Sequence, residues 1–547
     1  MNTRLNERSA RSAKQTFFIL AVVIIAVVYL LPLIFTAVIS TREYAGMRPR
    51  LIGEIDKGFT YYADFLGSYY LPRLMRNTAL LTLCPALVTA VTALLLILAV
   101  SNLPNKALRT IALMLLAVPS FVPLAYLTSL FMNVFSYEGH ATRALVSLGI
   151  IGENRDLMSD KAFYLPIYTA FETLRFLFFP VLAGVLALEN KASGKLVTAL
   201  KISLAYILVR LSLTFILDYE LTRALYRPVT YEVSDTIAAF VNRRGLTEGE
   251  VGYGAAIDII RFIAQAIVNT GVFFALRALF YSRGRLVSDP MPSKPPARKG
   301  GAAMSVISVI VFLILAAGSL YVTAGLVFPG LIVKDALLRF EGFSVQSLIG
   351  RWFLNSFIYA VPRAAIFAVI SYIIAYPLAT RSKTVWVLAV IALSSGALMM
   401  ANSILFKHIG INNTALGAIL FGSFSCAGAA ALGLSLRRKF INPPSFPEYT
   451  RAAAKGVLVL FLLGFAVFWC SNTWAGAMLV NRDLYPITIL IHEQTFFGFA
   501  AGGRAEDYSL ISGITLVASL PPLAAVWTAL VFNKKLPTGL LGAGFRV

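Results

Sequence analysis

Six charged residues of this sequence lie inside strongly apolar segments, where a charge needs a partner. Glu172 and Arg175 are three residues apart, and Asp258 and Arg261 repeat that spacing. Residues three apart share one face of a helix, so each acid can pair with its arginine. A charge in the middle of a membrane helix costs about 2.5 to 3.5 kcal/mol on insertion scales, so it requires an opposite charge or a water-lined cavity.

Two interpretations of these charged pairs stay open. In the first, they line a polar pathway, where they bind the hydroxyl groups of a solute or set a gate. In the second, each pair neutralises itself and holds helices together. The remaining two residues, Arg210 and Arg363, have no acid within four residues in the sequence, although Arg210 can complement Glu172 across a helical bundle.

The apolar segments around these residues recur about twelve times along the 547-residue chain. A run of about 20 apolar residues spans a bilayer core as a helix, because a helix satisfies its own backbone hydrogen bonds. The chain is 58% hydrophobic, and we expect an all-α, polytopic membrane protein with about twelve transmembrane helices. The expected spans lie near residues 16–39, 77–101, 110–135, 163–188, 197–217, 255–281, 304–328, 353–378, 385–406, 414–434, 454–478 and 509–532.

Basic residues set the expected orientation of these spans. The net charge is +22, and Lys and Arg gather in short loops beside the apolar runs. The positive-inside rule then places both termini and every second loop on the cytoplasmic side of the cell membrane. Anionic membrane lipids are the expected counterpart of this charge, and nucleic acid is not an expected partner.

The chain divides into two halves of about six spans each. Residues 282–302 are rich in Pro, Gly and basic residues, which predicts a cytoplasmic linker. Residues 1–281 form the first expected half and residues 303–547 the second. Because an even number of spans restores the orientation, the halves are expected to be parallel repeats with a pathway along their interface.

One short pattern occurs in both halves. Asn77 and Thr78 open the second expected span, and Asn355 and Ser356 open the eighth. A short basic turn follows each of them after a similar interval. This echo supports the parallel repeat.

Motifs for catalysis and metal binding are missing from the sequence. It contains neither a glycine-rich phosphate loop nor a serine nucleophile elbow. Its three histidines, His140, His408 and His492, are far apart in the sequence and follow no zinc-binding spacing. We therefore expect a transport component that is not an enzyme and that has no metal site and no cofactor of its own.

Two expected outer loops carry the clearest family pattern. Residues 231–246 read YEVSDTIAAFVNRRGL, with GYGAA at 252–256, and residues 481–486 read NRDLYP after Trp474. Across about residues 16–532 the chain resembles the fused pair of permease subunits of binding-protein-dependent ABC importers for complex sugars and oligosaccharides. The resemblance implies a type I importer permease fold, separate ATP-binding subunits that hold ATP and Mg, and an extracytoplasmic solute-binding protein that delivers a carbohydrate.

Three sets of site residues follow. The charged groups proposed for the substrate pathway are Glu172, Arg175, Arg210, Asp258, Arg261 and Arg363. The resemblance implies an outer gate that meets the binding protein, formed by Tyr231, Glu232, Asp235, Arg482, Asp483 and Tyr485. It also implies contacts with the ATPase from Asn190, Ser193, Gly194, Arg437, Arg438 and Glu448.

The cytoplasmic docking loops depart from the family pattern. The family's EAA motif forms a short helix that docks into the ATPase, and no such motif precedes Asn190 or follows Arg438. Three prolines in residues 443–447 disfavour a regular helix there. A second hypothesis is therefore a permease-derived membrane scaffold or sensor that has lost its coupling to an ATPase.

Overall fold

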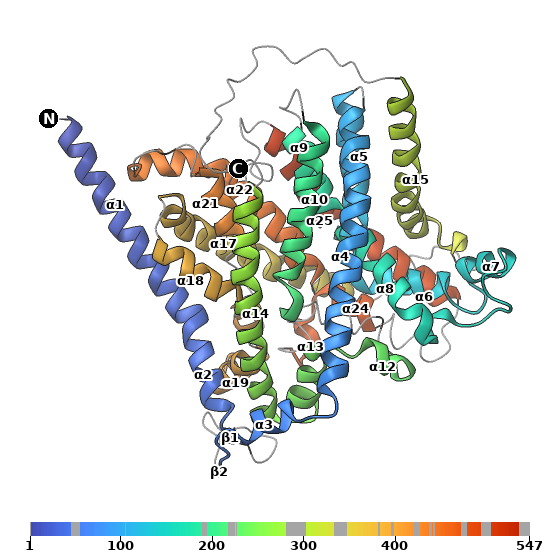
Figure 1. Cartoon of the computed structure of the whole chain (residues 1–547), viewed down its shortest axis with the longest axis horizontal. Helices are drawn as coiled ribbons and strands as arrows, with labels where there is room; N and C mark the ends of the chain where they lie inside the picture. Colours follow the sequence, from blue (N-terminus) through green and yellow to red (C-terminus); the bar gives the residue numbers. More distant parts are fainter. Residues whose placement is uncertain are drawn as a thin grey trace.

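The computed structural model is built almost entirely from helices (Figure 1). The structure describes residues 2–44, 55–103, 105–188, 194–216, 225, 227–280, 302–332, 347–380, 383–394, 399–420, 427–436, 440, 443–471, 479–493 and 505–534. The predicted linker at 282–302 lies outside the described residues, apart from Ala302. The half boundaries therefore stay a prediction.

The elements follow one another in this order. Before the predicted linker, the helices are α1 (Asn2–Ile25), α2 (Leu31–Ile39), α3 (Thr60–Leu66), α4 (Leu71–Asn102), α5 (Lys106–Phe121), α6 (Leu124–Val134), α7 (His140–Ser147), α8 (Lys161–Phe176), α9 (Phe178–Leu188), α10 (Lys195–Leu211), α12 (Tyr231–Ser234), α13 (Ile237–Val241) and α14 (Val251–Phe280). After it come α15 (Ala302–Val327), α17 (Ser347–Ala379), α18 (Lys383–Ser394), α19 (Met399–Ile409), α20 (Ala415–Leu420), α21 (Ala427–Leu436), α22 (Phe446–Cys470), α24 (Ile487–Glu493) and α25 (Ala505–Lys534). A two-stranded antiparallel ribbon joins β1 (Arg42–Glu43) to β2 (Ile55–Asp56).

Short turns of tighter or wider helix complete the described elements. The 3-10 turns are η2 (Leu157–Ser159), η3 (Thr214–Ile216), η4 (Pro228–Thr230), η6 (Pro329–Leu331) and η8 (Arg482–Leu484). The π turns are η1 (Ala26–Leu30) and η5 (Asn242–Thr247). Turn η1 ends two residues before Pro32, whose missing N–H removes one bond of the regular helical ladder. Despite this local change, α1, η1 and α2 form one continuous span.

The count of twelve spans is not confirmed. Among the described residues, six helices are long and apolar enough to cross a membrane, and up to eight spans result if two bent helix pairs each count as one. The expected span at 110–135 is broken between α5 and α6, which meet at 89° beside Pro123. The expected span at 163–188 is bent by 44° between α8 and α9. Helix α10 is shorter than the span expected at 197–217, because it ends at Leu211.

The first helix of each predicted half packs against the other half. Helix α1 lies against α17 and α18, whereas α15 lies against α4 and α5. The two helices run along opposite edges of the bundle (Figure 1). One buried apolar cluster extends from α4, α5 and α8 through α17, α22 and α25, so a continuous core joins the parts before and after the linker.

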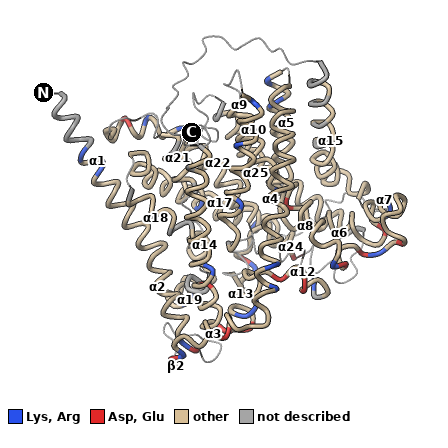
Figure 2. The backbone as a smooth tube through the Cα atoms, in the orientation of Figure 1, with Lys and Arg blue, Asp and Glu red and all other residues tan. Residues whose placement is uncertain are grey.

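Acidic residues are unevenly distributed along the bundle, whereas basic residues lie at both ends (Figure 2). Acidic residues are frequent at the end that carries β2, α3 and α12, whereas the starts of α5 and α10, at the other end, carry Lys106 and Lys195. This is the pattern from which the positive-inside rule assigns the α5 end to the cytoplasm. The side on which each terminus lies stays a prediction.

Candidate functional site

The start of α4 is bonded to the loop that begins α12 and α13. The amide Nδ2 of Asn77 donates hydrogen bonds to the carbonyl oxygens of Glu232, at 3.0 Å, and Asp235, at 3.1 Å. The Oγ1 of Thr78 accepts a hydrogen bond from the backbone N–H of Ile237 at 3.1 Å. We call this arrangement the first latch, because it fixes both ends of a turn to one end of a long span.

The start of α17 repeats the arrangement. Here the amide Nδ2 of Asn355 donates to the carbonyl oxygens of Asp483, at 2.8 Å, and Tyr485, at 3.1 Å. The Oγ of Ser356 accepts from the backbone N–H of Ile487 at 2.9 Å. This second latch uses the same kinds of donor and acceptor in the same order. In both latches the second carbonyl bound by the asparagine lies two residues before the N–H bound by the hydroxyl, as Asp235 precedes Ile237 and Tyr485 precedes Ile487.

An arginine one helical turn before each asparagine completes each latch. Arg73 lies 3.5 Å from Asp235, and Arg351 lies 3.5 Å from Asp483. Sequence reasoning missed both arginines. Alignment of the two Asn-hydroxyl patterns would have found them, because each arginine precedes its asparagine by four residues.

The two latches differ in burial. The carboxylate of Asp235 is 0% exposed and also binds Arg243, whose Nη2 lies 2.8 Å from Oδ2. The side chains of Asp483 and Arg351 are 48% and 54% exposed. The first latch therefore encloses a fully buried carboxylate, whereas both partners of the ion pair in the second latch are in contact with solvent.

The other predicted outer-gate residues lie around these latches. Glu232 forms a 2.5 Å ion pair with Lys161, and this hydrogen bond lowers the pKa of the Glu232 carboxyl below its ordinary value of 4.5. Arg243 lies over the ring of Tyr231, 5.5 Å from its centroid. In the second loop Arg482 begins η8. The ring of Tyr485 packs against the ring of Trp352, with 5.6 Å between the ring centroids. The structure thus brings each predicted trio together at its own latch.

The predicted pathway charges do not form one cluster of contacts. Glu172 is buried and pairs with Arg210 of α10, whose guanidinium also lies over the ring of Phe176 at 4.8 Å. The pairing with Arg175 suggested by sequence spacing is therefore replaced by a contact between two helices. Arg175 lies 6.0 Å from the centroid of the Phe176 ring.

Asp258 and Arg261 pair as their spacing predicts, at 2.7 Å, and they also support the end of α10. Both Nε and Nη2 of Arg261 donate to the carbonyl oxygen of Phe215. One turn further, Gln265 donates to the carbonyl oxygen of Ser212 and accepts from the N–H of Phe215. These contacts satisfy the backbone groups that are exposed where α10 stops, so they favour the helix-locking interpretation.

Arg363 is the sixth predicted pathway residue. It lies on α17 and is 2% exposed. Its guanidinium lies over the ring of Phe468 of α22, 4.7 Å from the centroid. A cation so placed is stabilised by the negative face of the ring.

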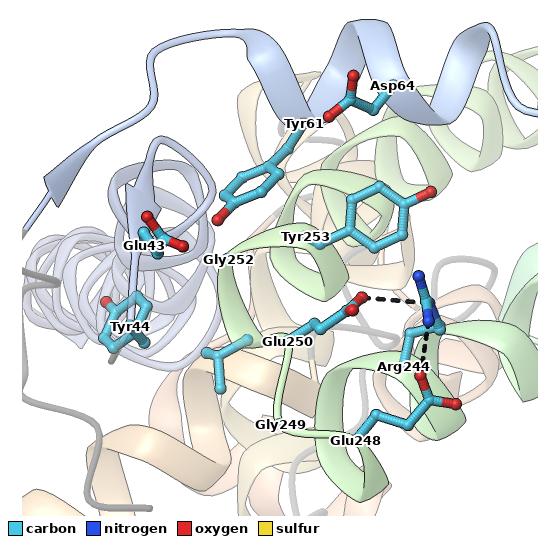
Figure 3. Close-up of a pocket in the computed structure, with 11 residues that line it drawn as sticks. Glu43, Tyr44, Tyr61, Asp64, Arg244, Glu248, Gly249, Glu250, Gly252 and Tyr253 are labelled. Carbon is cyan, nitrogen blue, oxygen red and sulfur yellow. Dashed lines mark hydrogen bonds and ion pairs between the residues drawn. The ribbon is translucent and has the colours of Figure 1, made fainter. Parts of the chain in front are cut away.

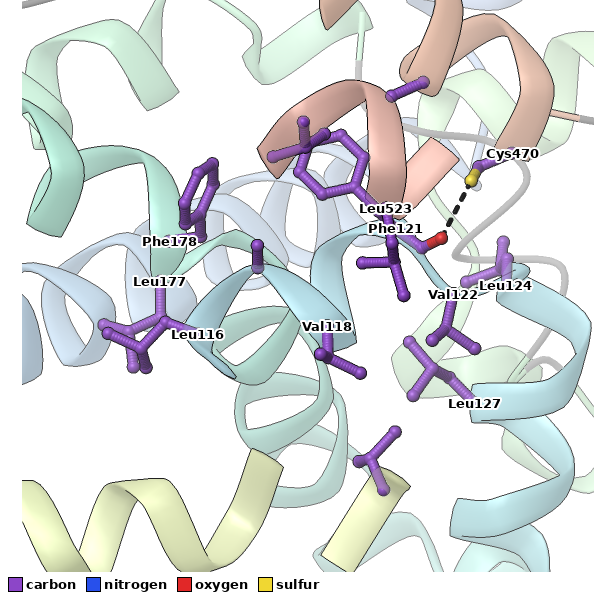
Figure 4. Close-up of a cluster of buried hydrophobic side chains, with 14 of the residues drawn as sticks. Leu116, Val118, Phe121, Val122, Leu124, Leu127, Leu177, Phe178, Cys470 and Leu523 are labelled. Atoms are coloured by element: carbon purple, nitrogen blue, oxygen red, sulfur yellow. Dashed lines mark hydrogen bonds between the residues drawn. The ribbon is translucent and has the colours of Figure 1, made fainter. Parts of the chain in front are cut away.

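The end of α22 binds backbone carbonyls on two other helices. Trp469 Nε1 donates to the carbonyl oxygen of Ala518 at 2.7 Å, which Pro522 leaves without its usual helical donor. Cys470 Sγ donates to the carbonyl oxygen of Phe121 at 3.2 Å, where α5 ends before Pro123 (Figure 4). Apolar side chains surround this contact, including Val122, Leu124, Leu127 and Leu523. Apolar side chains from both parts of the chain therefore enclose the Cys470–Phe121 contact.

Two of the predicted ATPase contacts lie in the described part of the chain. Gly194 has a φ of 71°, a conformation that favours glycine, and it directly precedes α10. Glu448 forms a capping box with Ser445 at the start of α22. Asn190, Ser193, Arg437 and Arg438 lie outside the described residues.

A polar pocket of about 410 Å³ opens at the end of the bundle that carries α3 (Figure 3). Four carboxylates contribute to its lining, from Glu43, Asp64, Glu248 and Glu250. Arg244 pairs with Glu248 at 2.7 Å and with Glu250 at 3.1 Å. Burial raises the pKa of the Tyr61 phenol, which also lines the pocket. Sequence reasoning did not single out this pocket, because its residues come from three separate segments.

Comparisons with known proteins find similar chains among the solved structures, two of which are described below. No protein-family model and no curated protein sequence matches the chain. One structure is that of a bacterial alginate ABC transporter in complex with an alginate pentasaccharide-bound periplasmic protein. That chain is 20% identical over 40% of this chain and 81% of its own, with a TM-score of 0.35. The other is a bacterial ABC transporter involved in the import of the acidic polysaccharide alginate, 18% identical over 41% of this chain and 85% of its own, with a TM-score of 0.37. Likenesses at these TM-scores fix neither the fold nor the solute of the present chain.

Proposed function

We propose that this chain is the permease component of an ABC importer that carries a carbohydrate or oligosaccharide across the cytoplasmic membrane. The duplicated latch is the observation that carries the proposal. Two spans, α4 and α17, begin with the same arginine, asparagine and hydroxyl residue, and each binds its own loop through the same backbone atoms. Such a duplication is expected of two like-oriented bundles that enclose one route between them.

A separate ATPase supplies the work in this proposal. The sequence has no nucleotide-binding motif, so ATP and Mg are bound by partner subunits. Nucleotide states that bind one arrangement of the permease better than the other drive alternation between inward and outward access. Gly194 and Glu448, at the starts of α10 and α22, belong to the surface proposed to meet the ATPase, and the two latched loops face the solute-binding protein.

The missing EAA motifs favour one alternative, a permease-derived scaffold or sensor without ATPase coupling. Copurification from the native membrane, followed by reconstitution in liposomes, distinguishes the two. An importer copurifies with a nucleotide-binding subunit. In liposomes it transports an oligosaccharide only when ATP is present on the side of the membrane that corresponds to the cytoplasm. A stable assembly without any nucleotide-binding subunit, and without ATP-dependent uptake, would contradict the proposal.

A matched pair of variants locates the coupling surface. Gly194→Val forces a side chain into a left-handed backbone conformation, so we expect it to reduce sugar-stimulated ATP hydrolysis. Gly58→Val carries the same change at a φ of 52° near α3, at the opposite end of the bundle, and is expected to leave hydrolysis unchanged. Equal effects of the two variants would show a general loss of folding instead of a loss of coupling.

A further inference from the structure

A row of buried hydroxyl groups runs along α25. Its members follow one another at intervals of one, three or four residues and are each 0 or 1% exposed; they are Tyr508, Ser509, Ser512, Thr515 and Ser519. Residues three and four apart lie on one helical face. We call these five residues the hydroxyl row.

The hydroxyl row lies where α25 meets the part of the chain before the predicted linker. Helix α25 packs against α5, α6, α15 and α24. The ring of Tyr126, from α6, lies 6.4 Å from the ring of Tyr508, and its hydroxyl interacts with Tyr508 and Ser512. A side chain added at Gly325 of α15 would meet the Tyr126 hydroxyl at 2.8 Å, so only a glycine permits this close approach. The row is therefore enclosed by both parts of the chain.

Two buried hydroxyls of the row lack a well-formed hydrogen bond. The Oγ1 of Thr515 and the Oγ of Ser512 make no well-formed hydrogen bond within the described part of the chain, although both side chains are fully buried. The groups that interact with Ser512 are the phenols of Tyr126 and Tyr508. Ser519, one turn further, donates to the carbonyl oxygen of Thr515 at 2.7 Å. A buried polar group without a partner is costly, and in a membrane interior no bulk water relieves that cost.

The two buried amide side chains of α14, Gln265 and Asn269, both have hydrogen-bond partners. There Gln265 bonds to Ser212 and Phe215, and Asn269 donates to Ser394 at 2.9 Å. Packing alone therefore explains these two residues of α14. It does not explain Ser512 and Thr515, for which alanine and valine would fill similar space at a lower cost.

We infer that the hydroxyl row, together with Tyr126, is a contact site for a neutral, polyhydroxylated part of the transported solute. Each hydroxyl both donates and accepts a hydrogen bond, as sugar hydroxyls do. No residue of the row is charged, so the site matches an uncharged polyol better than an acid or a cation. This inference rests on the proposed function and adds the position and chemistry of the solute contact.

The second latch holds a helix that packs on both α25 and α6. Ser356 binds the N–H of Ile487, the first residue of α24. Helix α24 in turn packs on α6 and on α25. Release of the second latch would free α24, which packs on the helix that carries the hydroxyl row. The ion pair of this latch is the solvent-exposed one.

The test compares single-hydroxyl deletions in the full chain, purified in lipid nanodiscs. Ser512→Ala and Thr515→Val each remove one hydroxyl that has no well-formed hydrogen bond, and Ser519→Ala is the control, because its hydroxyl is already bonded within α25. Maltotriose is the neutral probe and trigalacturonate the acidic one. Equilibrium binding and the thermal unfolding midpoint without sugar are measured for each protein.

We expect the wild-type chain to bind maltotriose more tightly than trigalacturonate. Loss of one hydrogen bond is expected to weaken maltotriose binding by about three- to tenfold in the first two variants and by less than about twofold in the control. The unfolding midpoint of the first two variants is expected to be unchanged or higher, because each removes a buried hydroxyl without a well-formed hydrogen bond.

Three results would overturn the inference. In the first, the wild-type protein binds neither probe or prefers trigalacturonate. In the second, Ser512→Ala and Thr515→Val keep the wild-type affinity for maltotriose. In the third, their affinity falls only together with a lower unfolding midpoint. The ATPase question is answered separately by copurification. Maltotriose binding at the row without any ATP-binding partner would leave this inference intact and contradict the proposed ATP-driven import.

Discussion

The two latches share one hydrogen-bond plan and differ in solvation. In the first, the carboxylate of Asp235 is fully buried between Arg73 and Arg243. In the second, Asp483 meets Arg351 in contact with solvent. A duplicated motif can thus keep its backbone bonds while one copy becomes rigid and the other becomes easier to open. We expect the first latch to act as a fixed anchor and the second to be movable.

The largest expected effect is that of Asp235→Asn. This variant leaves two arginines facing a neutral amide in a desolvated site. Breaking a buried ion pair typically costs roughly 3 to 5 kcal/mol, and the partial exposure of both arginines reduces the expected loss in the free energy of unfolding to roughly 2 to 3 kcal/mol. Denaturant titration in detergent micelles measures it. A loss below about 1 kcal/mol would show that burial does not distinguish the latches.

The asparagines are expected to matter equally in the two latches. Asn77→Ala and Asn355→Ala each remove two hydrogen bonds to loop carbonyls, so each should lower the free energy of unfolding by about 2 kcal/mol. Limited proteolysis should show the detached loop in each case. Asn413→Ala is a control for general loosening of the second loop, because the Asn413 side chain accepts hydrogen bonds from the backbone N–H groups of Val480 and Asn481. Strongly unequal losses for Asn77 and Asn355 would argue against a shared plan.

A smaller effect is expected for Asp483→Asn. Exposed ion pairs contribute less than about 1 kcal/mol, so the free energy of unfolding should change little. The rate at which the second loop opens should nevertheless rise, and hydrogen exchange of the Ile487 amide measures it. Unchanged exchange at Ile487 would contradict the expected mobility of the second latch.

The smallest effect concerns pH at the first latch. The pKa of Glu232 is lower in the folded chain than its ordinary 4.5, because Lys161 binds the charged form. Because the pKa is lowered in the folded state, this contact contributes fully to the free energy of unfolding above about pH 4.5. Its contribution is lost as the pH falls through the lower, folded-state pKa. Unfolding midpoints of wild type and Glu232→Gln, measured across that window, should converge at the acidic end. Convergence on the alkaline side instead would reverse the assigned sign.

The sequence predicted the helical class and singled out the Asn-hydroxyl pair of each latch, because apolar length and a repeated residue pair are local patterns. It did not predict that Arg73 and Arg351 complete the latches. It did not predict the breaks within spans. Pro123 marks one of them, but the Cys470 thiol that binds the Phe121 carbonyl there comes from a segment almost 350 residues away. It also suggested a Glu172 to Arg175 pair, since spacing shows neighbours on one helix and cannot show that Arg210 arrives from another. The hydroxyl row was missed because serines and threonines in an apolar run read as ordinary helix residues.

Side-specific labelling tests the central claim, that two like-oriented bundles form one assembly. Single cysteines replace Glu232 and Arg482 in a chain whose Cys84, Cys426 and Cys470 are changed to serine, and a membrane-impermeant thiol reagent is applied to intact cells. We predict that both positions react from outside and that a cysteine placed within residues 282–302 reacts only after the membrane is opened. Labelling of positions 232 and 482 from opposite sides would contradict the parallel repeat on which the proposed function depends.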